Sequence, residues 1–135
     1  MTYIPELLRQ VVIERAQQKC EYCLLNERYG IYSHEIDHII PEKHRGQTVD
    51  SNLCYACLDC NRNKGSDFAS LDPVTGDVAL LYNPRQDQWT EHFELDEARI
   101  VALTPTGRVT EFILKLNDPQ RLLNRQRLYT LQRYP

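Results

Sequence analysis

The sequence predicts an α+β protein with an N-terminal helix, a motif of two strands and a helix closed by two cysteine pairs, and a C-terminal elaboration. Three observations predict this class. Apolar residues recur at helical spacing near the start. Two Cys-x-x-Cys pairs enclose residues 20–66. Short strand patterns and then two helical patterns fill residues 67–135. The 135 residues are 41% hydrophobic and 26% charged, so we expect one domain over residues 1–135.

The first half of the chain is expected to contain a helix, two strands and a second helix, in that order. A helix is predicted over about residues 5–18 from the spacing of Ile4, Leu7, Leu8, Val11, Val12 and Ala16. Residues 33–40 predict a strand that Pro41 stops, and residues 53–56 predict a second one. The second cysteine pair then opens a short helix, which Gly65 ends.

The second half has turn, strand and helix signals in succession. A turn is predicted at residues 72–76, where Asp, Pro and Gly combine. Strands are expected around residues 78–82, 89–95 and 99–103. Helical spacing returns at residues 109–116 after Thr106-Gly107. Asp118-Pro119 is typical of a helix start and predicts a last helix that carries several arginines.

The composition limits the location and the partners. No apolar run reaches the length of about 18 residues that a membrane span needs, and the start lacks a secretion-signal pattern. We therefore expect a cytoplasmic protein whose cysteines bind metal rather than form disulfides. The net charge of −3 argues mildly against nucleic acid. However, 12 of the 16 basic residues are Arg, and residues 118–135 carry a local charge of +3, which is compatible with a phosphate-binding surface.

The two cysteine pairs are predicted to hold a structural Zn²⁺. Four thiolates form the tetrahedral donor set of such a site, and the ligands would be Cys20, Cys23, Cys57 and Cys60. A redox dithiol and unrelated core cysteines are the alternatives. A redox dithiol is disfavoured because the usual strand–helix–strand setting is absent. Cys54 also pairs with Cys57 at this spacing, and we assign Cys54 to the core.

Between the cysteine pairs lie residues that a structural zinc does not require. Phosphodiester hydrolysis needs a base and a positive charge on the phosphate. His38 can be the base, because imidazole titrates near neutrality. Asp37 and Asn61 offer the hard oxygen ligands that Mg²⁺ or Mn²⁺ prefers. Neighbours on a regular strand point to opposite faces, so Asp37 and His38 face one metal only if the strand ends or is distorted there.

Further polar residues complete the predicted site. Asn52 precedes the second strand, where its amide could tie the loop to the backbone near His38. Lys64 lies one helical turn after Asn61 and could reach a neighbouring phosphate. Together with Arg62 and Arg45 it forms the predicted nucleic-acid contact. Each residue alone is more often structural, and only their order and spacing together favour catalysis.

These motifs resemble the HNH endonuclease family of the His-Me finger (ββα-metal) superfamily. The resemblance covers residues 20–66 and rests on Cys20-x-x-Cys23, His34-Glu-Ile-Asp37-His38-Ile-Ile-Pro41, Gly46, Asn52-Leu53 and Cys57-x-x-Cys60-Asn61-x-x-Lys64. It implies that His38 is the general base, that Asp37 and Asn61 bind the catalytic cation, and that Asn52 orders the loop. The last position is Asn61 instead of the His in the family name, which favours Mg²⁺ or Mn²⁺ over softer ions.

The sequence therefore predicts a metal-dependent DNA endonuclease without an organic cofactor, which leaves 5′ phosphates on its products. A zinc-stapled DNA- or protein-binding module without catalytic activity is the first alternative. It explains the cysteines and arginines but treats the positions of Asp37, His38 and Asn61 as coincidence. A thiolate-bound iron centre for electron transfer is the second alternative, and it explains only the cysteines.

Overall fold

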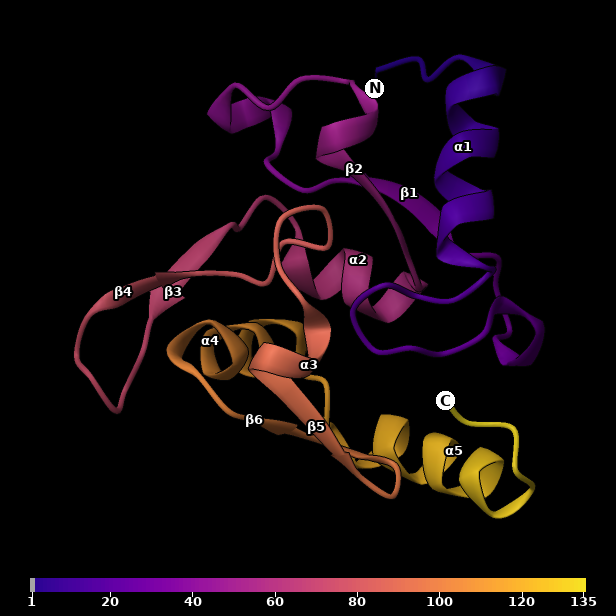
Figure 1. Cartoon of the computed structure of the whole chain (residues 1–135), viewed down its shortest axis with the longest axis vertical. Coiled ribbons are helices and arrows are strands. Elements are labelled where there is room, and N and C mark those ends of the chain that lie inside the picture. Colours follow the sequence, from indigo (N-terminus) through magenta and orange to yellow (C-terminus); the bar gives the residue numbers. More distant parts are fainter. Residues whose placement is uncertain (1) are drawn as a thin grey trace.

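The protein has an α+β fold, as the sequence predicts (Figure 1). A computed structural model describes residues 2–135. Its elements are α1 (Glu6–Ala16), β1 (Glu35–His38), β2 (Leu53–Ala56), α2 (Leu58–Lys64), β3 (Ala69–Leu71), β4 (Val78–Leu80), α3 (Trp89–His92), β5 (Phe93–Asp96), β6 (Arg99–Ala102), α4 (Pro105–Leu114) and α5 (Pro119–Thr130). Within this part of the chain, no helix combines the length and the apolar character that crossing a membrane requires.

Helix α1 confirms the predicted N-terminal helix, but its buried stripe is narrower than the sequence predicts. Val12 and Ala16 enter a small core with Leu53 and Tyr55 of β2. Leu7, which was expected on the apolar face, is 78% exposed. The helix ends at Ala16, and the left-handed backbone of the next residue, Gln17, turns the chain toward the first cysteine pair.

The strands form three separate antiparallel pairs, β1–β2, β3–β4 and β5–β6. In the first pair, Glu35 lies opposite Ala56 and His38 lies opposite Leu53. Side chains alternate between the two faces of a strand, and each face of this strand pair packs against a different helix. One face carries Leu53 and Tyr55 against α1, and the other faces α2.

The main core joins the two halves of the chain. It contains cysteines and Tyr22 from the first half and apolar residues from the second half, namely Leu81, Tyr82, Phe93, Ile100, Val109, Leu114 and Leu116. Hydrogen bonds also cross the same boundary. The indole of Trp89 donates to the carbonyl of Tyr22 at 2.9 Å, and the hydroxyl of Tyr134 donates to the carbonyl of Cys23 at 2.7 Å. In Figure 1, α2 lies between the two halves.

The predicted strand over residues 89–95 is wrong at its start. Trp89–His92 forms the short helix α3, and the strand β5 begins only at Phe93. The helical turn brings the rings of Trp89 and Phe93 to a centroid distance of 5.1 Å. Its last carbonyl, that of His92, accepts the amide of Leu103 at 2.8 Å. These tertiary contacts outweigh the strand propensity of the sequence.

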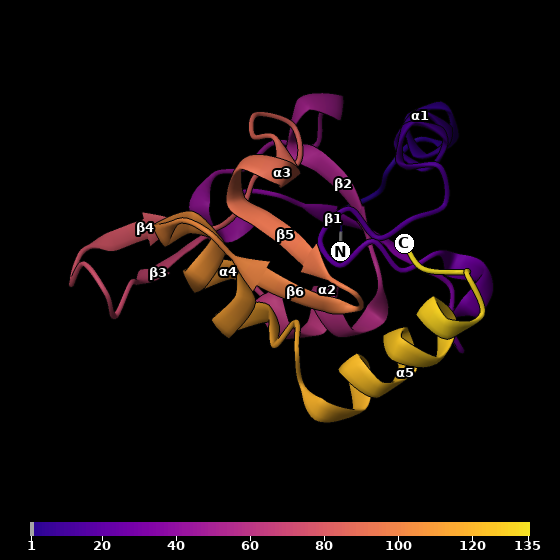
Figure 2. The same ribbon diagram turned by 60° about the horizontal axis from the view of Figure 1, so that its bottom comes forward.

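The hairpin β3–β4 projects from the body of the molecule in both overall views (Figures 1 and 2). The predicted turn is present between its strands, and Gly76 adopts a φ of +76° there. The Asp72 carboxylate accepts the amide of Thr75 at 3.1 Å. It also receives the Arg108 guanidinium from α4 at 2.8 and 2.9 Å. This paired bond fastens the hairpin to α4.

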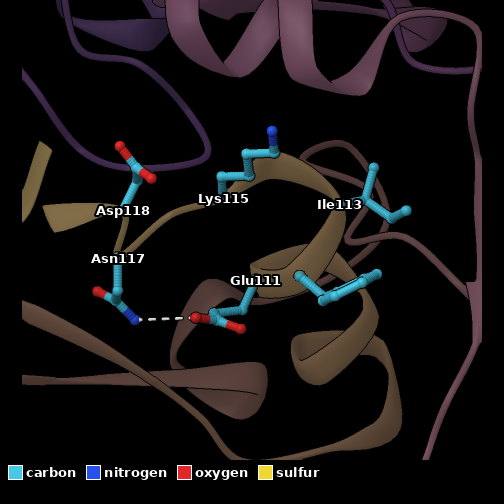
Figure 3. Close-up of a pocket in the computed structure, with 6 residues that line it drawn as sticks. Glu111, Ile113, Lys115, Asn117 and Asp118 are labelled. Carbon is cyan, nitrogen blue, oxygen red and sulfur yellow. Dashed lines mark hydrogen bonds between the residues drawn. The ribbon is translucent and has the colours of Figure 1, made fainter.

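The turn from α4 to α5 is held by Asn117. Its carboxamide accepts the amide of Ile100 at 3.0 Å and donates to the carbonyl of Ile100 at 2.7 Å. Figure 3 shows its further bond to Glu111, at 3.2 Å, on the rim of a hollow of about 400 Å³. Arg125 of α5 donates to the same Asn117 at 3.0 Å. The start of α5 is therefore fixed relative to α4 and β6.

Candidate metal centre and active site

The four predicted zinc ligands converge on one buried point. The sulfur atoms of Cys20, Cys23, Cys57 and Cys60 all lie within 4.8 Å of one another. The Cys23 and Cys57 sulfurs are 3.7 Å apart. A tetrahedral site with Zn–S bonds of about 2.3 Å requires sulfurs about 3.8 Å apart, so the donor set and the spacing both fit a structural zinc. Within residues 2–135 this is the one group of three or more Cys, His, Asp or Glu donors placed to share a metal.

The backbone of each pair curls around its first cysteine. The amide of Cys23 donates to the sulfur of Cys20 at 3.5 Å, and the amide of Cys60 donates to the sulfur of Cys57 at 3.4 Å. Cys57 is also the N-cap of α2, so one thiolate both caps the helix and faces the metal position. The second cysteine pair thereby sets where α2, with Asn61, begins.

Cys54 lies outside the cluster, in agreement with its predicted place in the core. It is fully buried in β2, and its thiol donates to the Tyr22 hydroxyl at 3.5 Å. Burial raises the pKa of this thiol to about 12. A neutral, enclosed thiol of this kind is a packing residue.

Asp37 faces α2 and is paired there with Lys64. The Lys64 ammonium lies 3.0 Å from Oδ2 of Asp37, and it donates to the carbonyl of His38 at 2.9 Å. Burial raises the pKa of the Asp37 carboxyl, and the ammonium of Lys64 opposes that shift. The contact to Oδ2 is an ion pair without good hydrogen-bond geometry, so this oxygen retains lone pairs that are not used.

The position of Lys64 corrects its predicted role. The residue is 1% exposed, and its charge is directed at the end of β1. A nucleic-acid phosphate in solvent has no access to a buried ammonium that is already bound. Lys64 therefore tethers α2 to β1 and does not contribute to an exposed phosphate-binding surface.

Asn61 faces the same strand, one helical turn before Lys64. Its amide donates a short hydrogen bond to the carboxylate of Glu35. Glu35 and Asp37 are two residues apart on β1 and share a face. Asn61 and Lys64 of α2 thus meet Glu35 and Asp37 of β1 where the two elements are in contact. Glu35 is exposed, so the Glu35–Asn61 side of this contact is open to solvent.

His38 is the last residue of β1, and its side chain points away from that of Asp37. Its Nε2 lies 2.9 Å from the Thr48 hydroxyl and 3.9 Å from the Glu42 carboxylate. Its side chain is 16% exposed. Strand alternation therefore turns the carboxylate toward α2 and the imidazole toward the loop of residues 39–52. The side-chain partners of His38 and those of Asn61 do not overlap within residues 2–135.

The loop after His38 is tied by Asn52, as expected from the sequence. The amide of Ile40 donates to Oδ1 of Asn52 at 2.9 Å, and Nδ2 donates to the carbonyls of Ile40 and Gln47 at 3.0 and 2.9 Å. Gly46 permits this closure, because a Cβ there would lie 1.6 Å from the carbonyl oxygen of Ile40. The loop that carries Thr48 is consequently held next to His38.

The remaining polar residues of this region divide into exposed and buried ones. Arg45 and Arg62 are exposed, so both are accessible to a ligand. His44 is exposed and packs its ring on Phe68 at a centroid distance of 4.8 Å. His34 is buried, and its Nε2 bonds to the carbonyl of Leu25 at 2.8 Å. His34 thus packs within the fold instead of facing solvent.

Two residues of the site were missed in the sequence. Glu35 had a detectable signal, because side chains two apart on a strand share a face and Glu35 is two residues before Asp37. Thr48 had none, since a single hydroxyl in a polar loop is ordinary. Its contact with His38 depends on how the loop closes.

A ββα motif with a four-cysteine cluster, an Asp-His step and a helix-borne Asn defines the class of site. In comparisons with known proteins, residues 20–67 match the family model of the HNH endonucleases. The match covers about a third of the chain and confirms the resemblance over those residues. It suggests a nuclease that uses a divalent metal and acts on nucleic acid. Neither the curated proteins nor the solved structures contain a match to this chain.

Proposed function

We propose that this protein is a metal-dependent endonuclease that hydrolyses DNA phosphodiester bonds. The observation that carries the proposal is the contact between β1 and α2, where Asp37 pairs with Lys64, Asn61 bonds to Glu35, and His38 ends the same strand. The family match over residues 20–67 supports it.

The catalytic cation would be held by Asp37 and Asn61, with Glu35 as a further ligand. All three offer oxygen donors, which suit Mg²⁺ or Mn²⁺. When bound, the cation would neutralise charge on the phosphate and on the leaving oxygen. The carboxylate of Asp37 is presented by β1, and the carboxamide of Asn61 is presented by the helix that Cys57 caps. The zinc site thereby sets the spacing of the two ligands.

His38 would act as the general base that takes a proton from the attacking water. When Nε2 shares its proton with the Thr48 hydroxyl, the lone pair remains on Nδ1. Thr48 would then fix both the tautomer and the orientation of the ring. The loop tied by Asn52 would hold Thr48 in place.

Arg45 and Arg62 would bind phosphates on either side of the cleaved bond. Both side chains are exposed and carry the planar guanidinium that suits phosphate. Arg45 is in the loop after His38, and Arg62 is on α2 next to Asn61. Contacts of this kind position a backbone without reading its sequence.

The proposal is tested by plasmid cleavage with Mg²⁺ or Mn²⁺, comparing wild type with His38→Gln. Glutamine keeps a hydrogen-bonding group near Thr48 but takes up no proton at neutral pH. We expect a rate loss of roughly 10²–10⁴-fold, which is typical for the loss of a general base. Zinc content and circular dichroism should remain those of the wild type.

His92→Gln is the matched control, because His92 lies in α3, outside the HNH match. It should cleave at the wild-type rate. A folded wild type that cuts DNA with no divalent cation other than its bound zinc would contradict the proposal. Equal cleavage by His38→Gln and wild type would remove His38 from the mechanism.

One observation favours the second candidate, a zinc-stapled DNA- or protein-binding module. The Asp37 carboxylate already has the Lys64 ammonium as a partner, and a cation would have to share it. A module without activity would bind DNA with a salt-dependent affinity and leave it intact. The cleavage assay separates the two candidates.

A further inference from the structure

We propose that Arg121 is a positioning residue of the zinc centre. Its guanidinium donates hydrogen bonds to the cysteine thiolates and so couples the C-terminal helix to the metal ligands. The residue lies in α5, about 60 positions after the second cysteine pair in the sequence. Its Nη2 lies 3.0 Å from the sulfur of Cys60 and 3.8 Å from that of Cys57. Its side chain is 10% exposed, so this contact is largely shielded from water.

The other half of the guanidinium is anchored to α4. Its Nη1 donates to the carbonyl of Leu114 at 2.6 Å and to that of Lys115 at 3.0 Å. These carbonyls belong to the end of α4, where helical acceptors have no intrahelical partner. The planar group therefore joins the end of α4 to two thiolates, with one nitrogen on each side.

Electrostatics explains why an arginine occupies this position. Four thiolates around Zn²⁺ carry a net charge of −2 in a buried site. A guanidinium beside them offsets part of that charge, and its N–H groups satisfy sulfur lone pairs. Partners of this kind hold metal ligands in place and tune the metal affinity. Asp59, whose carboxylate is 3.9 Å from Nε of Arg121, is largely exposed and competes weakly.

A second contact from the C-terminus reaches the other cysteine pair. The hydroxyl of Tyr134, which is 5% exposed, donates to the carbonyl of Cys23. Residues after the HNH match thus touch both halves of the zinc site. Arg121 is the member of this set that reaches the sulfur atoms themselves.

This assignment differs from the DNA contact that the basic C-terminal segment suggests. Arg125, one turn further along α5, is 2% exposed and donates to the carbonyl of Ala98 at 3.0 Å. Arg121 and Arg125 therefore point into the protein, whereas Arg127 is exposed. Arg127 provides a control on the same helix.

The test measures zinc release from the full-length, zinc-loaded protein into excess chromogenic chelator. We expect Arg121→Met to release zinc roughly 10–100-fold faster than wild type, because removing a partner of a metal ligand weakens metal affinity by about that factor. Arg127→Met should release it at the wild-type rate. Arg121→Lys should fall between, because an ammonium keeps the charge but does not bridge the carbonyls and the sulfurs.

A spectroscopic measurement separates sulfur contact from general destabilisation. In the Co²⁺-substituted protein, loss of N–H donors to sulfur should move the thiolate-to-cobalt charge-transfer band to longer wavelength in Arg121→Met. Arg121→Lys should show a smaller shift of the band. It replaces Arg121→Met as the test variant if the Met variant does not fold. Wild-type release rates and unshifted bands in both variants would overturn the proposal. A folded wild type that binds no zinc would also overturn it, independently of any nuclease activity.

Discussion

At the scale of single residues, Lys64 shows how burial changes the meaning of a charge. Its ammonium is enclosed and lies between the Asp37 carboxylate and the carbonyl of His38. Removing one partner of a buried pair leaves the other charge without compensation. Lys64 therefore orients the two adjacent residues on which the proposed chemistry depends.

We predict that Lys64→Met lowers the free energy of unfolding by about 3–5 kcal/mol, the usual cost of breaking a buried pair. The pH dependence follows from Asp37, whose carboxyl pKa is already raised by burial and should rise further without the ammonium. A raised pKa in the folded state penalises folding above that pKa, and the penalty shrinks as the pH falls through it. The difference from wild type should thus be larger near pH 7 than at about pH 5.

Urea unfolding at both pH values measures this. Lys43→Met, at an exposed lysine in the loop after β1, is the control and should change little. The double variant Asp37→Asn, Lys64→Met should cost less than the sum of the single changes. An additive double variant would show that the two side chains do not interact.

At the scale of elements, the hairpin β3–β4 depends on a bond to α4. A two-stranded hairpin alone is marginally stable in water. The buried Asp72 carboxylate receives two bonds from Arg108 and also caps the turn between the strands. The hydrogen bonds from Arg108 hold the pKa of Asp72 well below its usual range.

We predict that the stability of the wild type falls more steeply in acid than that of Asp72→Asn. A lowered carboxyl pKa contributes stability above the unfolded value of about 4, and this is lost as the pH falls toward the folded value. Near neutrality, Asp72→Asn should be the less stable protein. Urea midpoints from about pH 7 down to pH 3 record both effects. Asp67→Asn, at an exposed aspartate, should follow the wild-type curve.

At the scale of the whole molecule, the metal site and the apolar core are one structure. The four cysteines belong to the same buried cluster as Phe93, Ile100, Val109 and Leu114. Structural zinc binds with about 10–16 kcal/mol, which compares with about 5–15 kcal/mol for the stability of a typical domain. The metal should therefore decide whether the second half of the chain folds on the first.

We predict that stripping the metal with a strong chelator unfolds both halves together. The single tryptophan, Trp89, reports on the junction because its indole donates to Tyr22 within the first cysteine pair. Its fluorescence should move to longer wavelength in the same transition in which helical circular dichroism is lost, and added Zn²⁺ should restore both. The same chelator saturated with zinc beforehand is the control. A native tryptophan signal after metal loss would show that the C-terminal part folds independently.

Local patterns were enough to predict much of this protein. The cysteine spacing predicted which four residues converge, and Gly65 predicted where α2 ends. The strand predicted over residues 33–40 is shorter, since β1 spans Glu35–His38. The turn at residues 72–76 follows from Asp, Pro and Gly at their preferred places. These features depend on a few adjacent residues or on donor chemistry, both of which a sequence contains in full.

Other features depended on contacts between distant residues. The sequence predicts a strand at Trp89, but the structure has a helical turn there, because the indole donates to the carbonyl of Tyr22 in the first cysteine pair. From the sequence, Lys64 and Arg121 could both belong to a phosphate-binding surface. In the structure, Lys64 is bound by His38, 26 positions away, and Arg121 is bound by Cys60, 61 positions away. The identity of a charged residue does not indicate whether its side chain is exposed or buried.

The sequence by itself determined the four cysteines that converge, the order of most elements and the chemical groups available for the proposed reaction. Only the tertiary structure decided which cations face inward, and it is what added Glu35 and Thr48 to the site. The physical reason is that ligand type and turn chemistry are local properties. Burial and pairing, in contrast, are set by elements that pack together from opposite ends of the chain.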